Sequence, residues 1–440
     1  MQLRRTISIL AAAALIAAGC GDDDGEESTP TGGDTAASTP ASTDASTVPA
    51  ATSSPGATTE PSGTDAPDAT GATTAPGGDC TLDEPLTIGY AADFSEFGGF
   101  ADQPGSEAAG VQVELLNAAG GVGGQNVEYV IKELPSDPSA AQRVAQELLD
   151  DGVEAIIGPP FAYSGTPLID TVDGQVPIIS NASTDLALAQ PDRGAFLMSF
   201  SDPVQAAAAA EFAYGDGART AVTFSSPDDP YFTNTTAAFT DAFGEAGGEV
   251  VRDFTFGIAD EDFSSQVNEL SSLDPAPDVL YTAMIMPGAG VLLEQLEAAG
   301  LGDMLVVGAD SFDATVVWSA GEVANGVSFT GHTFPREENG VQEFLDAAAE
   351  AGAEIETVSF GALASDVVKV FAYAAETACS VEGTAMIDAI TNISDLEVTT
   401  GNVTYAGTNG VPEKDVVILT VEEGEPAFTD TFRPSYIPGS

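Results

Sequence analysis

The sequence predicts an α/β protein with two lobes, each built on a parallel sheet with helices on both faces. Short apolar runs alternate with amphipathic segments between residues 86 and 308, which is the pattern of parallel strands connected by helices. The chain holds about nine such strands, more than one βα series needs, and 440 residues leave room for two medium-sized lobes beside a tail. Two similar lobes are therefore favoured over one sheet.

The first series of elements begins near Leu82. Its expected strands lie at 86–92, 126–133, 154–157 and 176–179, and its expected helices at 104–118, from the Ser136-Asp137-Pro138 cap to about 151, and from about 165. An acceptor side chain directly before a first-turn proline is a typical helix start, which places Asp137 at the beginning of the second helix.

Four glycines follow the first predicted helix, at positions 120, 121, 123 and 124. They favour a helix C-cap and a tight turn into the next strand. A phosphate-binding loop is the alternative, but that loop needs a lysine and precedes a helix, whereas these glycines come after one.

The second series starts at Asp202. Its expected helices lie at 203–215, 230–246, 262–272 and 287–300, and its expected strands at 219–224, 248–255, 278–283 and 304–308. Open α/β sheets bind ligands beyond the carboxyl ends of their strands. Two lobes with facing strand ends would form a cleft for a ligand.

The first 79 residues are expected to direct the protein out of the cytoplasm and to tether it to the membrane. Residues 1–19 combine a short basic start, an apolar run too short to span a bilayer and a small-residue end, as a secretory signal peptide does. The small residues before Cys20 resemble the bacterial lipobox, although Ala17 stands where leucine is more usual. The resemblance implies that Cys20 is lipidated and holds the protein at the outer face of the membrane; signal cleavage beside an incidental cysteine is the alternative.

Residues 20–79 are rich in Thr, Ser, Pro, Asp and Gly and poor in large apolar side chains, so we expect a disordered acidic linker. No apolar stretch after the signal approaches the roughly 20 residues that cross a bilayer.

Two cysteines remain, Cys80 before the first strand and Cys379 at the end of a predicted helix. An even pair in an exported protein favours a disulfide; two free thiols are the alternative.

The composition is strongly acidic. The chain has 69 Asp and Glu residues against 11 Lys and Arg, a net charge of −58, while 43% hydrophobic residues are ample for two cores. Such a charge repels nucleic acid and anionic lipid, so we expect no nucleic-acid partner and contact with the membrane through the lipid anchor only.

The segment Leu115 to Gln125, which contains Asn-Ala-Ala-Gly-Gly-Val-Gly-Gly, resembles a signature of type I periplasmic binding proteins of the branched-chain amino acid class. Seven further motifs follow in the order of that family: Asp137-Pro138, Gly152–Pro159, Val176–Ser180, Ala246–Val250, Asp262–Ser264, Ala298–Leu301 and the hairpin Thr400–Gly410. Each motif alone is weak, but together they cover the folded part of the chain.

The resemblance implies two Rossmann-like lobes joined by three crossovers. We expect residues 84–201 and 333–398 in lobe 1, and residues 202–332 and 399–436 in lobe 2. The family closes on a small solute and delivers it to an ABC permease. A monomer with no cofactor and no metal is expected.

The resemblance also implies site residues. In the family, backbone N–H groups and hydroxyls of the first lobe hold a ligand carboxylate, and an acidic side chain of the second lobe meets the ammonium. Ala182 and Thr184 match the family's stretch that contacts the carboxylate and the ammonium, and Ser183 between them is a candidate with them. Tyr231 matches the aromatic that closes over the ligand, and Asp310 matches the acidic partner of the ammonium. Phe100 lies within one position of the place where the family has an aromatic residue after the first strand. Lobe packing for Tyr231 and a helix cap for Asp310 are the alternatives.

The chain departs from the family pattern at the pocket. Ala162 stands where a serine is usual, so one hydroxyl is missing unless Ser164 replaces it. Phe161, Tyr163 and the run from Met284 to Met286 suggest an apolar pocket. A branched-chain amino acid, a larger hydrophobic amino acid, an amide and an uncharged organic solute all stay open, with an ammonium or another donor favoured by Asp310.

No catalytic motif is present. The chain has one histidine, His332, which excludes histidine clusters for zinc and is expected to be structural near a crossover. The nucleophile elbow, the HExxH motif and the Walker lysine are absent. We therefore expect a binding protein of an ABC importer; a ligand sensor for an amino acid or amide that reports to a membrane or regulatory partner is the alternative.

Overall fold

The computed structural model describes residues 80–439, except residues 96, 136, 286, 315, 316, 318 and 319. The predicted signal peptide at 1–19, the predicted lipidation site Cys20, the predicted linker to residue 79 and Met286, predicted to line the pocket, lie outside the described residues.

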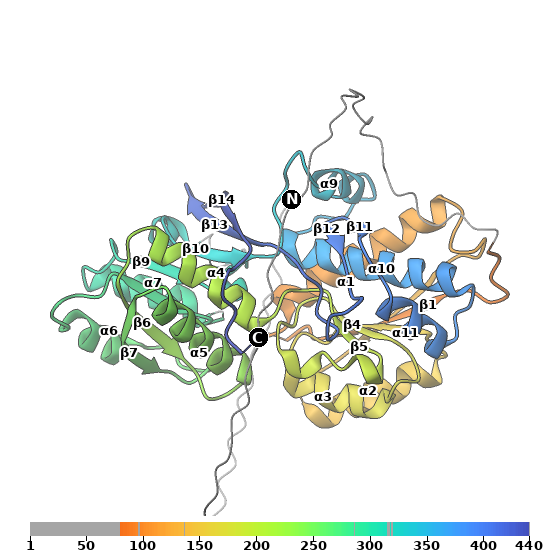
Figure 1. Cartoon of the computed structure of the whole chain (residues 1–440), viewed down its shortest axis with the longest axis horizontal. Helices are drawn as coiled ribbons and strands as arrows, with labels where there is room; N and C mark the ends of the chain where they lie inside the picture. The colour runs from red at the N-terminus through yellow and green to blue at the C-terminus, as the bar shows by residue number, and fades with distance from the viewer. Residues whose placement is uncertain are drawn as a thin grey trace, which may run out of the picture. The chain divides into compact units, whose positions relative to one another are not determined.

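The first lobe contains a five-stranded parallel sheet in the order β2-β1-β3-β4-β5 (Figure 1). Its strands are β1 (Thr87–Ala92), β2 (Glu128–Glu133), β3 (Ala155–Ile157), β4 (Ile178–Ser180) and β5 (Ala195–Leu197). The central strands are apolar on both faces because helices cover both, whereas β2 at the edge has three exposed positions out of six.

Helices of the first lobe cover both faces of this sheet. One core cluster joins the sheet to α1, α10 and α11, and another joins it to α2 and α3. Their bounds are α1 (Gly99–Ala118), α2 (Pro138–Asp150), α3 (Ala162–Val172), α9 (Val341–Glu350), α10 (Val358–Ala378) and α11 (Gly383–Thr391), with short 3₁₀ turns η1 (Leu186–Leu188) and η2 (Pro191–Arg193).

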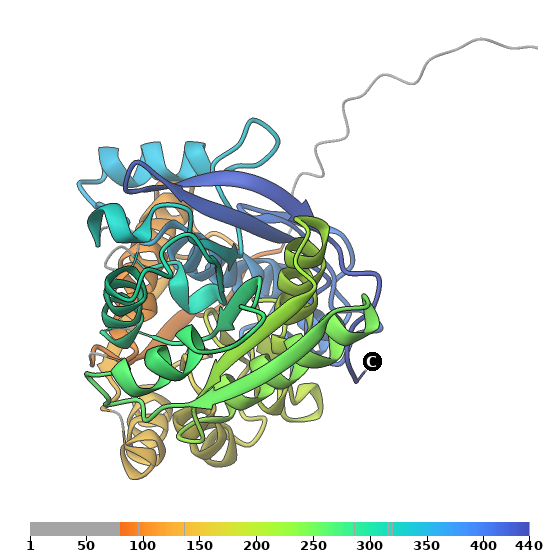
Figure 2. The ribbon, with the colours of Figure 1, turned by 90° about the vertical axis from the view of Figure 1, so that its left-hand side faces the viewer.

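The second lobe, which lies toward the viewer in Figure 2, contains a seven-stranded sheet. Its strand order is β14-β13-β10-β9-β8-β6-β7. The five strands from β10 to β7 are parallel, and the hairpin of β13 and β14 adds an antiparallel edge. The strands are β6 (Thr220–Ser225), β7 (Glu249–Thr255), β8 (Val279–Thr282), β9 (Leu305–Gly308), β10 (Ser328–Gly331), β13 (Val416–Glu422) and β14 (Glu425–Phe432).

One large core cluster fills the second lobe between this sheet and its helices. Helices α4 and α5 pack on each other, and α6 packs on α7. The bounds are α4 (Asp202–Gly215), α5 (Pro230–Glu245), α6 (Ser264–Ser271), α7 (Gly288–Ala298), η3 (Asp310–Phe312) and η4 (Gly321–Ala324). The predicted two-lobed α/β fold is confirmed, with more strands than the sequence indicated.

Three connections join the lobes: between β5 and α4, between β10 and α9, and after the small hairpin of β11 (Leu396–Val398) and β12 (Gly401–Val403). The third connection lies later than predicted. Val403 and Tyr405 pack in the core of the first lobe, and the Tyr405 hydroxyl donates to the Leu197 carbonyl at 2.6 Å. The boundary predicted at 399 is therefore wrong, because the hairpin buries its apolar side chains against the first lobe before the chain crosses.

Two local predictions are confirmed. The Asp137 carboxylate accepts the N–H of Ser139 at 2.9 Å and caps α2, with Pro138 as the first helical residue. The glycine run after α1 forms a tight turn in which Gly121 has φ +76°, and a Cβ there would lie 1.9 Å from the Gln125 carbonyl oxygen. Only glycine fits this position.

Helix α10 corrects the expectation that no later segment approaches membrane-spanning length. It is the one helix among the described residues that is long and apolar enough to cross a bilayer, and 83% of its most apolar window is buried. Its side chains form a large part of the first core, including Leu363, Val367 and Phe371.

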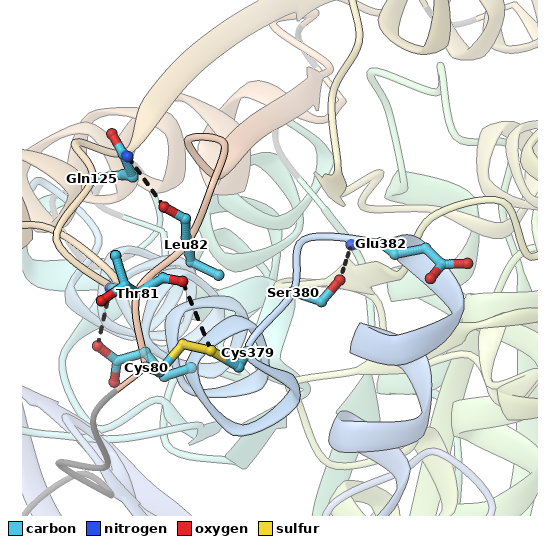
Figure 3. The surroundings of a disulfide bond; sticks show 9 residues. Cys80, Thr81, Leu82, Gln125, Cys379, Ser380 and Glu382 are labelled. Atoms are coloured by element: carbon cyan, nitrogen blue, oxygen red, sulfur yellow. Dashed lines mark hydrogen bonds between the residues drawn. A yellow bond between two sulfur atoms is a disulfide. The ribbon is translucent and has the colours of Figure 1, made fainter.

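Cys80 and Cys379 form a disulfide, with Cα atoms 5.5 Å apart (Figure 3). The bond ties the start of the described chain to the residue that caps the C-terminus of α10 in the left-handed conformation. Beside it, the Gln125 side chain donates to the Leu82 carbonyl at 3.1 Å. The bridge closes a segment of 299 residues, which contains almost the whole fold.

Removing the bridge is expected to lower stability strongly. A cross-link over so many residues restricts the unfolded chain, and losing such a bond costs about 2–5 kcal/mol. Denaturant unfolding of Cys80→Ser/Cys379→Ser against the oxidised wild type measures this loss. Equal unfolding midpoints and slopes for the two proteins would contradict the prediction.

Candidate functional site

The carboxyl ends of the strands converge on one pocket between the lobes. Loops after β3 and β4 line it from the first lobe, and loops after β6 and β9 line it from the second. The empty space within it, open solvent included, is about 380 Å³. The lining residues are Phe100, Pro160, Phe161, Ala162, Ala182, Ser183, Thr184, Asp185, Asp229, Tyr231, Asp310, Ser311 and Phe360.

The first lobe presents hydrogen-bond donors to the pocket. Helix α3 begins at Ala162, and the residue before it, Phe161, supplies no side-chain cap. The first N–H groups of a helix have no acceptor within the helix and carry a partial positive charge. Phe161 and Ala162 both line the pocket, so this helix end suits an anionic group such as a carboxylate.

The loop after β4 is held against the loop after β3. The Ser180 hydroxyl donates to the Pro159 carbonyl at 2.7 Å and accepts the N–H of Ser183 at 3.0 Å. The Ser183 hydroxyl in turn accepts the N–H of Asp185 at 3.3 Å. These bonds fix the backbone of residues 182–185 along the pocket wall.

Thr184 lines the pocket, but its hydroxyl is already engaged. It donates to the Asp202 carboxylate at 2.5 Å and accepts from the Gln205 amide at 3.3 Å. Gln205 also accepts the N–H of Asp310 at 3.0 Å and the hydroxyl proton of Thr330 at 2.9 Å. This buried network connects the first lobe, through the start of α4, to the second. Burial raises the pKa of Asp202 well above its usual range.

The second lobe presents a carboxylate. Asp310 follows β9, is 3% exposed, and accepts the Tyr231 hydroxyl at 2.7 Å on one oxygen. The other oxygen lies 3.0 Å from Nε2 of His332, which stacks on Phe200. Burial lowers the pKa of His332 below its ordinary value, although Asp310 opposes the shift. His332 therefore acts as a neutral donor, and no cation among the described residues balances Asp310.

Aromatic rings form the walls. Phe100 and Phe360 meet edge to face with centroids 5.4 Å apart, and both belong to the first lobe. Phe161 of the first lobe faces Tyr231 of the second, 6.4 Å away. The pocket thus combines donors, a buried carboxylate and apolar rings.

Eight of the expected site residues line the pocket: Phe100, Phe161, Ala162, Ala182, Ser183, Thr184, Tyr231 and Asp310. Three others do not. The Tyr163 hydroxyl donates to Asp93 at 2.8 Å, the Ser164 hydroxyl to the Phe161 carbonyl at 3.2 Å, and Met284 packs in the core of the second lobe. Ser164 therefore does not replace the hydroxyl missing at Ala162.

The sequence did not indicate five lining residues: Pro160, Asp185, Asp229, Ser311 and Phe360. Asp185 and Asp229 each stand directly before a helical turn, so their only visible signal was that of a cap. Phe360 lies on α10, far along the chain from the rest of the pocket, and nothing in its local pattern places it there. No cluster of three potential metal ligands occurs among the residues that the structure describes.

The fold and the sequence are similar to those of known solute-binding proteins. Residues 85–426 match the periplasmic binding protein family. The Leu/Ile/Val-binding protein homolog 3 of Brucella melitensis is 24% identical, over 77% of this chain and 92% of the relative. The leucine-binding protein LivK of Thermotoga maritima is 25% identical with a TM-score of 0.72, covering 79% of this chain and 99% of that one.

The branched-chain amino acid transporter substrate-binding protein LivJ of Streptococcus pneumoniae, in complex with isoleucine, has a TM-score of 0.72 at 23% identity. The match covers 80% of this chain and all of LivJ, and shows the same fold. Since the family match spans nearly all of the described chain, the protein belongs to the periplasmic binding protein family and has its two-lobed type I fold.

Proposed function

We propose that this protein is the extracytoplasmic substrate-binding component of an ABC importer. It captures a small amino acid, or a solute with the same charged groups, by closing its two lobes, and presents it to the permease. Family membership supports this role. So do the names of the relatives, which describe proteins that bind leucine, isoleucine or valine.

The observation that carries the proposal is that one pocket combines hydrogen-bond donors from the first lobe with a carboxylate from the second. The start of α3, with Phe161 and Ala162, offers N–H donors from the first lobe. Asp310 offers a buried carboxylate without a cationic partner from the second. A zwitterion matches both ends, and a buried Asp310 disfavours ligands that leave it unpaired.

Closure follows from the same arrangement. A ligand that contacts both lobes stabilises the closed state over the open one by its difference in affinity for the two states. The three connections between the lobes act as the hinge. We propose that the protein works as a monomer and without a cofactor.

A thermal-shift screen of the twenty amino acids tests the proposal. A ligand at 100 times its dissociation constant stabilises the native state by about 2.7 kcal/mol. We expect at least one amino acid to raise the melting temperature in a saturable way. Benzoate and glucose serve as non-zwitterionic controls, and a screen in which no amino acid stabilises the protein would refute the proposal.

We further propose that Cys20 carries a lipid that holds the protein at the outer face of the membrane. Two-phase detergent partitioning of the full-length chain, expressed in a bacterium that processes lipoproteins, measures this. The wild type is expected in the detergent phase and Cys20→Ser in the aqueous phase. Wild-type protein in the aqueous phase would exclude the anchor without affecting the binding proposal.

A further inference from the structure

We propose that the ligand carries a second cationic group, as an α-amino acid with an ammonium or guanidinium side chain does, and that Asp185 and Asp229 bind this group between the lobes. The inference rests on the proposed function and names the class of solute. It starts from two pocket residues whose only other role in the fold is to cap a helical turn.

The two carboxylates belong to different lobes. Asp185 follows β4 in the first lobe, and its Oδ1 accepts the N–H of Ala187 at 2.8 Å. Asp229 precedes α5 in the second lobe, and its Oδ1 accepts the N–H of Tyr231 at 2.9 Å. Both residues line the pocket.

Each of these carboxylates leaves its second oxygen without a hydrogen-bond partner among the described residues. The residues as a whole are 6% and 8% exposed, and their second oxygens are not among the fully buried atoms, so these oxygens are open to solvent in the pocket. Among other buried acids, Asp366 accepts the N–H groups of Thr399 and Thr400 on separate oxygens, whereas Oδ2 of Asp202 is buried without a partner.

The charges of Asp185 and Asp229, one from each lobe, act on each other across the gap between the lobes. Burial raises the pKa of Asp229, and the charge of Asp185 raises it further. Like charges that approach across a closing cleft oppose closure, whereas a cation between them favours it. A cationic group on the ligand would thus convert a repulsive contact between the lobes into an attractive one.

The rest of the pocket supports a ligand with two positive charges. Asp310 can pair with the α-ammonium, and Asp185 and Asp229 then remain. None of the lining residues is Lys or Arg, so nothing in the pocket wall balances them. The rings of Phe100, Phe161, Tyr231 and Phe360 can pack on a side-chain ammonium or guanidinium by cation–π contact. A ligand with a neutral aliphatic side chain would leave both carboxylates unpaired.

Isothermal titration calorimetry with matched ligands tests the inference. L-arginine is compared with L-citrulline, which replaces the guanidinium by a neutral urea, and L-lysine with L-norleucine, which lacks the charge. The wild type should bind at least one cationic member more tightly than its neutral partner, by at least about tenfold. All titrations use the oxidised chain and the same salt concentration.

Substitutions test which carboxylates produce the preference for cationic ligands. Asp185→Asn and Asp229→Asn keep an oxygen that can cap the helical turn but remove the charge, and each should lower the preference for the cationic ligand by about tenfold or more. Asp137→Asn is the matched control, because Asp137 also caps a helix but is exposed and lies outside the pocket. It should leave the preference unchanged.

The outcomes separate this inference from the proposed function. Tight binding of norleucine, leucine or citrulline, equal to or better than that of the cationic partners, would overturn the inference and leave the proposed function standing. A preference for the cationic ligands that survives both pocket substitutions would also overturn it. Absence of binding to every amino acid would refute both.

Discussion

Replacing Asp310 by alanine is expected to weaken amino-acid binding by about 2–5 kcal/mol, or roughly 30-fold to several thousand-fold. The loss is large because the ligand ammonium would then be buried without a countercharge. Calorimetry of Asp310→Ala against the wild type, with the amino acid that stabilises the wild type in the thermal screen, measures it directly.

Tyr231→Phe is the companion variant. It removes the hydroxyl that donates to Asp310 at 2.7 Å but keeps the ring that faces Phe161. Binding should fall by less than in Asp310→Ala, since the carboxylate remains. If Asp310→Ala folds, as judged by cooperative unfolding, and binds as tightly as the wild type, Asp310 does not contact the ligand.

Ala162→Pro is expected to weaken binding by about 1.5–3 kcal/mol, the usual worth of a hydrogen bond to a charged group. Ala162 is the first residue of α3, where proline is tolerated, and Phe161 before it is extended, with φ −129° and ψ 153°. The substitution therefore removes one N–H donor from the pocket while the helix can form.

Ala162→Val is the control for this variant, because it adds similar bulk and keeps the N–H group. The primary amide of the ligand gives a second control, since the amide lacks the negative charge that this donor should bind. We expect the penalty of the proline to be smaller for the amide than for the acid. An equal loss of binding free energy for Ala162→Pro and Ala162→Val would show that the volume of the side chain, and not the N–H group of residue 162, determines the effect.

An effect of pH on stability is expected from Asp102. Burial raises the pKa of this carboxyl to about 8 in the native state, against 3.8 as the ordinary value, although the Asp93 N–H and the Tyr90 hydroxyl oppose the shift. The native state therefore retains a proton that the unfolded chain has lost between these pH values, and the stabilising contribution fades as the pH rises through 8. Between pH 5 and pH 7 the wild type should lose about 2.7 kcal/mol relative to Asp102→Asn. Parallel stability profiles of the two proteins would contradict the assignment.

The alternation of strands and helices was enough to predict the architecture. Strands such as β1 and β6 are buried on both faces, and Asp137 with Pro138 marks a helix start that the structure reproduces. The third crossover was misplaced because a short hairpin such as β11–β12 carries no local signal for the lobe on which it packs. Its assignment depends on long-range contacts such as that of Tyr405 with Leu197.

The candidate site was predictable where it follows strand ends. Asp310 and the stretch from Ala182 to Thr184 come directly after predicted strands and reach the pocket. Phe360 could not be predicted, since it enters from α10. Asp185 and Asp229 were missed because a sequence with 69 acidic residues does not distinguish a buried carboxylate from a solvated one. That distinction depends on burial and on hydrogen-bond partners, which only the folded chain provides.

A distance measured between the lobes tests the central claim most directly. Spin labels at Gln146→Cys on α2 and Asn268→Cys on α6 occupy exposed positions of the first and second lobe, in a chain that carries Cys20→Ser and retains the Cys80–Cys379 disulfide. Electron–electron double resonance should show a shorter and narrower distance distribution when the stabilising amino acid is added, and a smaller change at the same ligand concentration when Asp310→Ala is present. A distribution that is the same with and without saturating ligand in the wild-type pocket would contradict closure of the two lobes on a solute.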